Sequence, residues 1–324
     1  MTHQNINIAI VGGGVGGLAL ALHLHERGVV CHVFEAVAEV RELGVGITLL
    51  PHAMRELAAL GIQPELEAAG IENYESAFFN RHGQFIYSEL RGRHAGYALP
   101  EVGIHRGKLH KILFDTAFMR LGADHVHTGY RFKSIAQNED TATLTLMEGV
   151  TQNDWNQAGK VEDVLKLFAD WKFDWLDVTQ LIANAESLLE YPMVDKDPID
   201  QWTFGRVTFL GDAAHPMYPR GSNGSAQALI DARTLADELA KFTDDQDPLP
   251  ALLRYENVRR PLANKVVQTN RTTPPDFINI KVYELTQGKP FRHIDDVISQ
   301  EELRKISDDY KKIAGFSLEA LKQG

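Results

Sequence analysis

A single cysteine, Cys31, stands in the 324 residues of this chain, so an internal disulfide is excluded. Its position in the apolar run from Val29 to Phe34 predicts a buried strand residue rather than a reactive thiol. The chain also lacks an apolar run of the roughly 20 residues that a membrane-spanning helix requires. No basic region with a cleavage site precedes the first apolar run. We therefore expect a cytoplasmic protein in a reducing compartment.

Positive charge is scarce. There are 33 Lys and Arg residues against 44 Asp and Glu residues, which leaves a formal net charge of -11. This balance repels nucleic acid and anionic membranes, so neither is an expected partner. Any anionic ligand must then be held by local groups. The remaining composition, with 44% hydrophobic residues, is typical of a globular protein with a substantial core.

Thirteen histidines raise the question of a metal site. His23 and His25 form a close pair, but side chains at positions i and i+2 of a helix diverge, and no second pair has metal-site spacing. We expect no metal. A G-x-S-x-G elbow is also missing, so a hydrolase triad has no support.

A glycine-rich turn lies between a strand predicted over residues 6–11 and a helical pattern over residues 18–27. Gly12 permits the tight turn, Gly14 lets a pyrophosphate touch the backbone, and Gly17 lets the helix lie close to the strand. The free N–H groups at the start of this helix then face the phosphates. Alone, the motif also fits a flexible surface turn. In this context it predicts a dinucleotide site.

Glu35 ends the second predicted strand, residues 29–35. A carboxylate there accepts hydrogen bonds from both ribose hydroxyls and repels a 2'-phosphate, so the dinucleotide is FAD or NAD rather than NADP. Val15, inside the glycine turn, joins the predicted cofactor contacts.

A second motif favours FAD. Gly211 and Asp212 follow a strand predicted over residues 206–210, and Asp212 is placed to accept hydrogen bonds from a ribityl chain. The pair alone is more typical of a strand-ending turn. A second helix start, at residues 221–225, aims N–H groups at the edge of the isoalloxazine that becomes negative on reduction. Both glycine motifs in this order predict FAD.

The chain resembles the class A flavoprotein monooxygenases, the p-hydroxybenzoate hydroxylase-like group, and within it the relatives of 5-methylphenazine-1-carboxylate 1-monooxygenase. The stretches that carry the resemblance are residues 12–17 with Glu35, 43–47, 104–107, 154–156, 168–171, 191–195 and 211–224.

The resemblance implies a role for each matching residue. Glu35 takes the adenosine ribose, Arg106 lies along the FAD, and Asp212 takes the ribityl or pyrophosphate region. The residues that border the flavin ring are Gly221, Asn223 and Gly224. Arg106 also opens a helix predicted over residues 107–121, where its guanidinium suits a diphosphate. A solvated arginine at a helix start is the alternative.

One family motif is missing. The family has an Asp-Gly pair at the end of a further strand, and this chain contains no Asp-Gly dipeptide. Strand-like residues 132–136 and 141–146 lead almost directly into residues 151–154, where relatives hold about 100 more residues, a small domain's worth. The missing sheet helps to keep water from the flavin, and activated oxygen decays to hydrogen peroxide in water. A natural minimal form, an engineered deletion and a wrongly joined gene model all remain open.

We predict an α/β fold, a Rossmann-like FAD-binding domain of the glutathione-reductase type with a reduced substrate-covering β region. The expected segments are 1–72, 103–150 and 201–272 for FAD binding, 73–102 for a short substrate-side hairpin region, 151–200 for a remnant of the substrate domain, and 273–324 for a C-terminal helical tail. The tail carries a capping box, Ser299 with Glu302, and we favour packing on the FAD domain over a dimer contact. Trp171, Phe173 and Trp175 are expected in the core rather than in a substrate box.

The expected function is FAD-dependent hydroxylation of an electron-rich aromatic or phenazine-like substrate with NAD(P)H and O2. NAD(P)H is expected as a transient co-substrate, because a second complete dinucleotide fold is missing. Oxygen transfer requires no acid–base pair, so no catalytic residue is assigned. The candidates for the substrate wall, for which plain packing fits equally well, are Ile47, Leu49, Met217, Tyr218 and Pro219. The alternatives are an NAD(P)H oxidase or dehydrogenase that makes peroxide, and a non-catalytic FAD-binding remnant. Monomer and homodimer both remain open.

Overall fold

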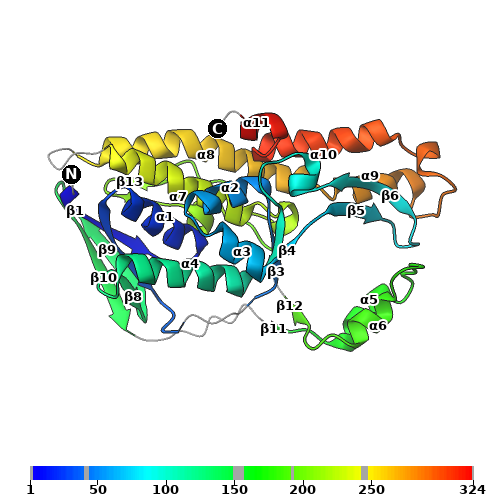
Figure 1. The fold of residues 1–324 in the computed structure, drawn as a ribbon, viewed down its shortest axis with the longest axis horizontal. Helices are drawn as coiled ribbons and strands as arrows, with labels where there is room; N and C mark the ends of the chain where they lie inside the picture. Colours follow the sequence, from blue (N-terminus) through cyan, green and yellow to red (C-terminus); the bar gives the residue numbers. More distant parts are fainter. Residues whose placement is uncertain (1–2, 40–43, 149–156, 191–192, 242–246, 323–324) are drawn as a thin grey trace.

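The computed structural model describes residues 3–39, 44–148, 157–190, 193–241 and 247–322. A parallel sheet lies at one end of an elongated molecule (Figure 1). Its strand order is β1-β2-β8, from β1 (His3–Val11), β2 (Val29–Glu35) and β8 (Val126–Thr128). Cys31 lies buried in β2, and burial raises the pKa of its thiol to about 12, as expected for an inert strand residue. The predicted strand–helix–strand unit is therefore confirmed.

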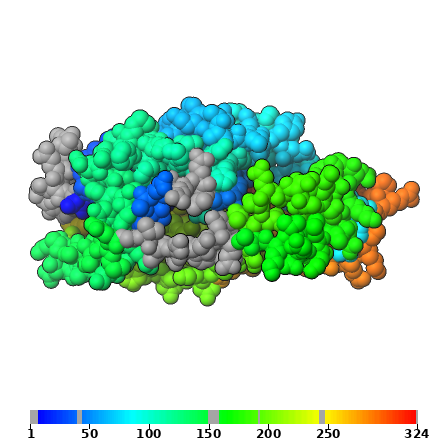
Figure 2. Space-filling model, turned by 90° about the horizontal axis from the view of Figure 1, so that it is seen from below, coloured from blue at the N-terminus to red at the C-terminus, as the bar shows by residue number. Residues whose placement is uncertain are grey.

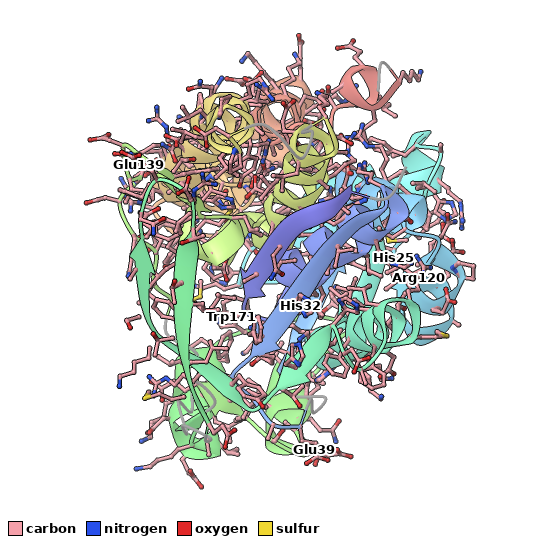
Figure 3. The ribbon with its side chains drawn as sticks, turned by 90° about the vertical axis from the view of Figure 1, so that its left-hand side faces the viewer. His25, His32, Glu39, Arg120, Glu139 and Trp171 are labelled. Carbon is pink, nitrogen blue, oxygen red and sulfur yellow. The ribbon has the colours of Figure 1, made fainter. Side chains whose placement is uncertain are left out.

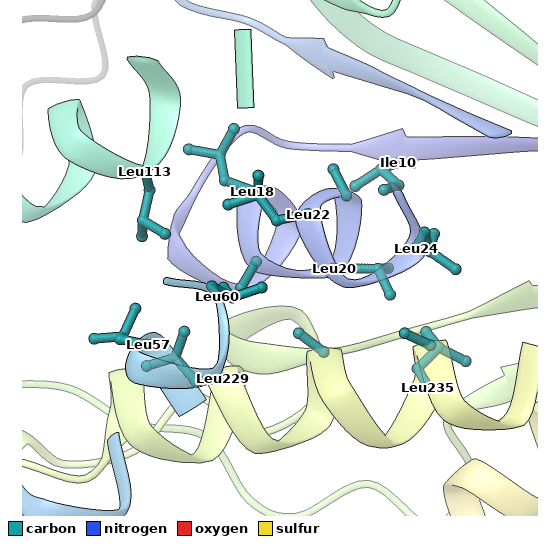
Figure 4. Close-up of a cluster of buried hydrophobic side chains, with 14 of the residues drawn as sticks. Ile10, Leu18, Leu20, Leu22, Leu24, Leu57, Leu60, Leu113, Leu229 and Leu235 are labelled. Carbon is teal, nitrogen blue, oxygen red and sulfur yellow. The ribbon is translucent and has the colours of Figure 1, made fainter. Parts of the chain in front are cut away.

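Helix α1 (Val15–Glu26) is the centre of the main core. Its sequence is apolar on nearly every face, and it packs between the sheet, α4 (Arg106–Leu121) and α7 (Gly224–Ala240). Figure 4 shows leucines of all three helices meeting around it. A Cβ on Gly17 would lie 2.1 Å from the carbonyl oxygen of Gly12, so only glycine lets α1 approach its strand so closely.

Besides a lobe described below, the helices outside the sheet unit are α2 (Pro51–Ala59), α3 (Gln63–Ala69), α8 (Leu249–Thr272), α9 (Phe277–Thr286), α10 (Gln300–Ala314) and α11 (Leu318–Lys322). Helix α8 packs on α7, on the side away from the parallel sheet, and α10 packs on α8 and α9 (Figure 1). Ser299 and Glu302 form the predicted capping box of α10. Within the chain, α10 packs on α8, and residues of α9 and α10 share a buried cluster with Ile86 and Tyr87.

The remaining strands form small antiparallel ladders. Their members are β3 (Gly46–Leu49), β7 (Val102–His105) and β4 (Ile71–Glu72); β5 (Glu75–Phe79) with β6 (Phe85–Leu90); β9 (Tyr130–Gln137) with β10 (Ala142–Glu148); β11 (Gln157–Ala158) with β12 (Leu189–Glu190); and β13 (Thr203–Phe204) with β14 (Val207–Thr208). The predicted hairpin within residues 75–90 is confirmed. Figure 3 shows Glu139 at the tip of the β9–β10 hairpin.

The predicted strand over residues 206–210 is shorter than expected. Only Val207–Thr208 form a ladder, and they pair with β13 rather than with the parallel sheet. Within the described ranges, β1 has β2 as its one strand neighbour. The second motif therefore meets the first through side-chain packing of Leu210 and α7 against α1, and not through a shared strand ladder.

Residues 157–190 form a separate lobe that contains α5 (Val161–Phe168) and α6 (Val178–Ala183). Figure 2 shows this lobe as a green bulge at one end of the molecule. None of the residues in these two helices is buried. Trp171 is 37% exposed and Trp175 is 62% exposed. The expectation that these two tryptophans lie in the core is wrong, because they belong to a solvent-exposed aromatic cluster with Phe79 and the partly buried Phe173.

In the described part of the chain, no helix combines the length and apolar character needed to cross a membrane.

Candidate cofactor site

The glycine turn of residues 12–17 is fixed by Glu35 at the end of β2. The N–H of Gly13 donates to Oε2 of Glu35 across 2.7 Å, and the N–H of Val37 donates to Oε1 across 2.8 Å. Gly12 has a φ of +107°, which side-chain-bearing residues rarely adopt. Each carboxylate oxygen has a second lone pair, so Glu35 retains acceptors for ribose hydroxyls. Charge and geometry both suit the adenosine end of a dinucleotide.

Helix α4 holds the turn from its other side. Nε2 of His110 lies 2.5 Å from the carbonyl oxygen of Gly13, and because that oxygen only accepts, Nε2 carries the proton. Arg106 begins the same helix four residues earlier, and its side chain is exposed. Among the described residues its guanidinium has no hydrogen bond or ion pair, and Gly44 packs on its aliphatic stem. His110 escaped the sequence analysis, although its i+4 spacing from Arg106 predicts a shared helix face.

A cavity of about 330 Å³ lies beyond Glu35, at the ends of β2 and β8. Its volume falls within the range of small-ligand pockets, about 300–1,000 Å³. The rings of Phe114 and Phe118, stacked 6.2 Å apart, form one wall. The lining residues are Ala38, Glu39, Lys111, Phe114, Asp115, Phe118, Val126 and Thr128. An aromatic base next to a ribose held by Glu35 fits this cavity, which the sequence analysis did not find.

The second motif turns sharply at Gly211, where φ is +57°. Asp212 follows with an exposed side chain. The turn rests on Asp231 of α7, whose Oδ2 accepts the N–H of Gly211 across 3.0 Å. Oδ2 of Asp231 also lies 2.5 Å from Nε2 of His215, and Oδ1 accepts Nε of Arg259 across 2.7 Å. The turn is thus held by a fully buried charged group.

Asp231 is ionised despite its burial. Desolvation opposes the charge, yet Arg259, His215 and the N–H of Gly211 together hold the pKa of Asp231 below its usual range. His215 is 1% exposed, so its role in the structure is to support the turn. The sequence analysis missed Asp231 and Arg259, because a charged residue within a helical pattern reads as a solvated surface residue.

The segment between Tyr218 and Asn223, here called the flavin-edge loop, leads into α7. Gly221 and Asn223 are buried, and Gly224 begins the helix. The side chain of Asn223 makes no hydrogen bond to the first turn of α7, which leaves the N–H groups of that turn available to an anion. Asn223 is 1% exposed, and its side-chain amide donates instead to the carbonyl oxygen of Gly221 and to the hydroxyl oxygen of Tyr310.

The five proposed substrate-wall residues do not share one surface. Leu49 is fully buried in the main core, and Ile47 packs against that core. Met217 is buried with Val266 and Val267 of α8. Leu49, Ile47 and Met217 therefore make ordinary core contacts, which is the alternative given for them from the sequence. Tyr218 and Pro219 keep partial or full exposure on the flavin-edge loop.

The two glycine motifs lie together. A Cβ on Gly16 would lie 2.7 Å from Cδ1 of Leu210 and 3.3 Å from Cβ of Ala228, so the start of α1 packs directly beside the second motif. A Cβ on Gly14 would meet no atom within 4 Å, which leaves open space at the turn where a pyrophosphate touches the backbone. The residues present therefore fit FAD. Among the described residues, no group of three potential ligands could hold a metal ion.

Three histidines lie close together on the sheet, apart from the glycine turns. The ring of His32 on β2, labelled in Figure 3, lies 4.6 Å from that of His125 and 5.6 Å from that of His127. Burial and the two neighbouring rings lower the pKa of His32. The cluster is therefore a ring-stacking feature of the sheet.

The comparison with known protein families agrees with the division of the chain seen in the structure. A family described as "FAD binding domain" matches residues 5–156 and 191–270. The internal stretch outside the match, residues 157–190, is the lobe of α5 and α6, and residues 271–324, which include α9, α10 and α11, also lie outside it.

Curated relatives match over most of their length. The chain is 34% identical to phenazine 1,6-dicarboxylic acid hydroxylase PhzS of Lysobacter antibioticus, over 83% of this chain and 90% of the relative. It is 25% identical to 3-hydroxybenzoate 6-hydroxylase 1 of Aquipseudomonas alcaligenes, over 84% and 89%. Among solved structures, HpxO of Klebsiella pneumoniae complexed with FAD and uric acid is 19% identical, with a TM-score of 0.74 over 99% of this chain and 98% of that one.

Proposed function

This chain belongs to the FAD binding domain family and is an FAD-dependent aromatic monooxygenase, and we propose that its substrate is a planar, phenazine-like aromatic acid. The 34% identity to a phenazine dicarboxylic acid hydroxylase supports the phenazine class over single-ring hydroxybenzoates, whose hydroxylases are about 25% identical. NAD(P)H supplies the electrons and O2 the inserted oxygen atom.

One observation carries the cofactor assignment, namely the packing of both glycine motifs at the start of α1 and α7. We propose that Glu35 binds the ribose, Arg106 the diphosphate and Asp212 the ribityl chain. Gly12, Gly14, Val15 and Gly17 provide the pyrophosphate turn. Gly211, Gly221, Asn223 and Gly224 shape the backbone at the flavin end, Asn223 from within the protein. These roles rest on position, charge and the family resemblance.

When bound, FAD would supply the hydride-accepting and oxygen-activating chemistry of the reaction. The chain's own groups bind and orient it. The N–H groups in the first turn of α7 favour negative charge at the flavin edge. Arg106 balances the diphosphate charge in a net-negative protein.

We further propose that the chain lacks an internal segment near residue 150. The alignment with the Lysobacter antibioticus protein runs over 370 positions but includes 83% of this chain, about 270 of its 324 residues, so about 100 positions have no counterpart here. The three-stranded parallel sheet and the exposed lobe of α5 and α6 also support a reduced cover. Residues 149–156 lie outside the described ranges.

A reduced cover favours a second activity, NAD(P)H oxidation that releases peroxide. Trp175, at 62% exposure, tilts onto Phe79 of the hairpin with ring centres 5.3 Å apart, so solvent reaches this aromatic cluster. Water near the flavin diverts activated oxygen to peroxide. We propose that the chain couples NAD(P)H oxidation to hydroxylation only partially.

Purified protein tests these proposals. A yellow protein with bound FAD is expected, and NADH and NADPH consumption is measured with phenazine-1,6-dicarboxylate, 3-hydroxybenzoate or no substrate, with peroxide assayed in parallel. Oxygen-18 from labelled O2 in the phenazine product supports hydroxylation. If the peroxide formed equals the NAD(P)H consumed with every substrate, the result contradicts hydroxylation and supports the NAD(P)H oxidase. A protein that gains no flavin absorbance with added FAD contradicts both.

A further inference from the structure

We propose that Tyr310, on the C-terminal helix α10, is a positioning residue that sets the flavin-edge loop and thereby tunes the affinity and reduction potential of FAD. The inference rests on the proposed placement of the flavin edge at this loop. Tyr310 lies 89 residues from Gly221 in the sequence, yet its hydroxyl oxygen is 3.4 Å from the carbonyl oxygen of Gly221. Its side chain is 3% exposed.

The hydroxyl of Tyr310 both accepts and donates a hydrogen bond, and it has a partner for each. Nδ2 of Asn223 donates to the Tyr310 oxygen across 2.8 Å, and the Tyr310 hydroxyl donates to Oδ1 of Asn270 across 2.7 Å. Nδ2 of Asn270 donates in turn to the carbonyl oxygen of Tyr218. One hydroxyl therefore links both ends of the flavin-edge loop to α8 and α10. Burial raises the pKa of Tyr310, so the hydroxyl keeps its proton at neutral pH.

His52 fixes the orientation of the Asn223 amide. Nδ2 of Asn223 also donates to the carbonyl oxygen of Gly221 across 2.9 Å, so its Oδ1 is the atom that faces Nε2 of His52, at 2.9 Å. Nε2 of His52 must then carry the proton. Burial lowers the pKa of His52 to about 4, which keeps the ring neutral in this tautomer at pH 7. Phe316 stacks on the ring at 4.9 Å.

The loop backbone lies directly against the phenol. A Cβ on Gly221 would be 1.7 Å from the Tyr310 oxygen and 2.6 Å from Oδ1 of Asn270. This contact explains glycine at that position independently of any cofactor contact. It also means that a shift of the phenol moves the loop, and with it the first turn of α7 that follows Asn223.

The phenol thus controls the direction of N–H groups that the proposed function aims at the flavin edge. When those groups point at the edge, they favour the reduced, negatively charged flavin. Removing the hydroxyl leaves the buried amides of Asn223 and Asn270 each short of a partner, and the loop relaxes to find others. The reduced flavin then loses more stabilisation than the oxidised flavin.

Tyr310→Phe is the test, because it removes one oxygen and keeps the ring. We expect FAD affinity, measured by flavin fluorescence, to fall about three- to tenfold, as for the loss of one or two buried hydrogen bonds. The midpoint potential of bound FAD should shift to a more negative value. Tyr87→Phe is the matched control: Tyr87 is also buried and its hydroxyl donates to Glu89, which accepts from Ser307 and Lys311 of the same helix, but it belongs to a different buried cluster from Tyr310.

Asn270→Ser provides a second route should Tyr310→Phe fail to fold, and it should shift the potential in the same direction. The double variant should lose little more than either single variant, because both break one chain of hydrogen bonds. A wild-type potential and FAD affinity in folded Tyr310→Phe overturn the inference. Equal shifts in Tyr87→Phe also overturn it, because they assign the effect to general loosening. Wild-type protein that binds no FAD overturns the proposed function itself.

Discussion

The carboxylate of Asp231 accepts a hydrogen bond from the backbone N–H of Gly211 across 3.0 Å, although the two residues lie 20 positions apart. The second glycine turn is therefore held by a charge in the interior of the protein. The same carboxylate balances Arg259, which is 4% exposed. We therefore expect both stability and cofactor binding to depend on the Asp231 side chain.

Asp231→Asn should lower both the free energy of unfolding and FAD affinity. The change leaves the buried Arg259 without its counter-charge, and breaking a buried pair in this way costs about 3–5 kcal/mol. Urea unfolding followed by circular dichroism measures the first quantity, and flavin fluorescence measures the second. Asp237→Asn, which breaks a partly exposed pair with Arg27, should cost less than about 1 kcal/mol. Equal losses in the two variants would contradict the assignment.

Glycine substitutions should separate folding from cofactor binding. Gly14→Ala meets no atom within 4 Å, so the apo protein should melt as the wild type does, while FAD binding weakens at least tenfold because the methyl occupies the pyrophosphate position. Gly17→Ala places a Cβ 2.1 Å from the carbonyl oxygen of Gly12 and should destabilise the apo protein itself. The measurements are thermal melts without FAD and titrations with it. Undiminished FAD affinity in Gly14→Ala would place the pyrophosphate elsewhere.

Glu35→Ala should weaken FAD binding more than tenfold. The side chain is the acceptor for the N–H groups of Gly13 and Val37 and the proposed acceptor for the ribose. Charge-assisted hydrogen bonds of this kind contribute about 1.5–3 kcal/mol each. Isothermal titration with FAD gives the affinity, and Glu65→Ala on the exposed surface of α3 is the control. Affinities that agree within twofold would argue against a ribose contact.

Acid should destabilise the protein through His52 and His23. Burial lowers the pKa of each to about 4 in the folded state, against 6.5 in the unfolded chain. The unfolded chain therefore takes up protons first, and stability present above pH 6.5 is lost as the pH falls towards 4. The slope reaches about 1.4 kcal/mol per pH unit for each histidine.

Urea unfolding at pH 7, 6 and 5 measures that slope. His52→Gln should reduce it by about half the two-histidine value, whereas His25→Gln, on the exposed side of α1, should leave it unchanged. A slope that His52→Gln does not alter would mean that His52 is not buried as a neutral ring.

Local pattern alone was enough to predict several elements. The glycine turn of residues 12–17, the hairpin of β5 and β6 and the Ser299 capping box each depend on neighbours within a few positions, and all occur in the structure. Glycine spacing, period-2 and period-3.6 patterns and side-chain capping act within a single element. The chain sequence therefore contains everything they require.

The supports of the candidate site depend on tertiary structure. His110 reaches Gly13 across 97 positions, and Tyr310 reaches Gly221 across 89. A periodic sequence pattern does not specify how two helices pack against each other. From the sequence alone Asp231 is interpreted as a surface charge, whereas in the structure it is buried and paired with Arg259. The exposure of Trp175 was likewise decided by what packs nearby and not by its own segment. The sequence by itself determined the two glycine turns at which we propose cofactor contacts, and the packing of distant helices determined how those turns are held.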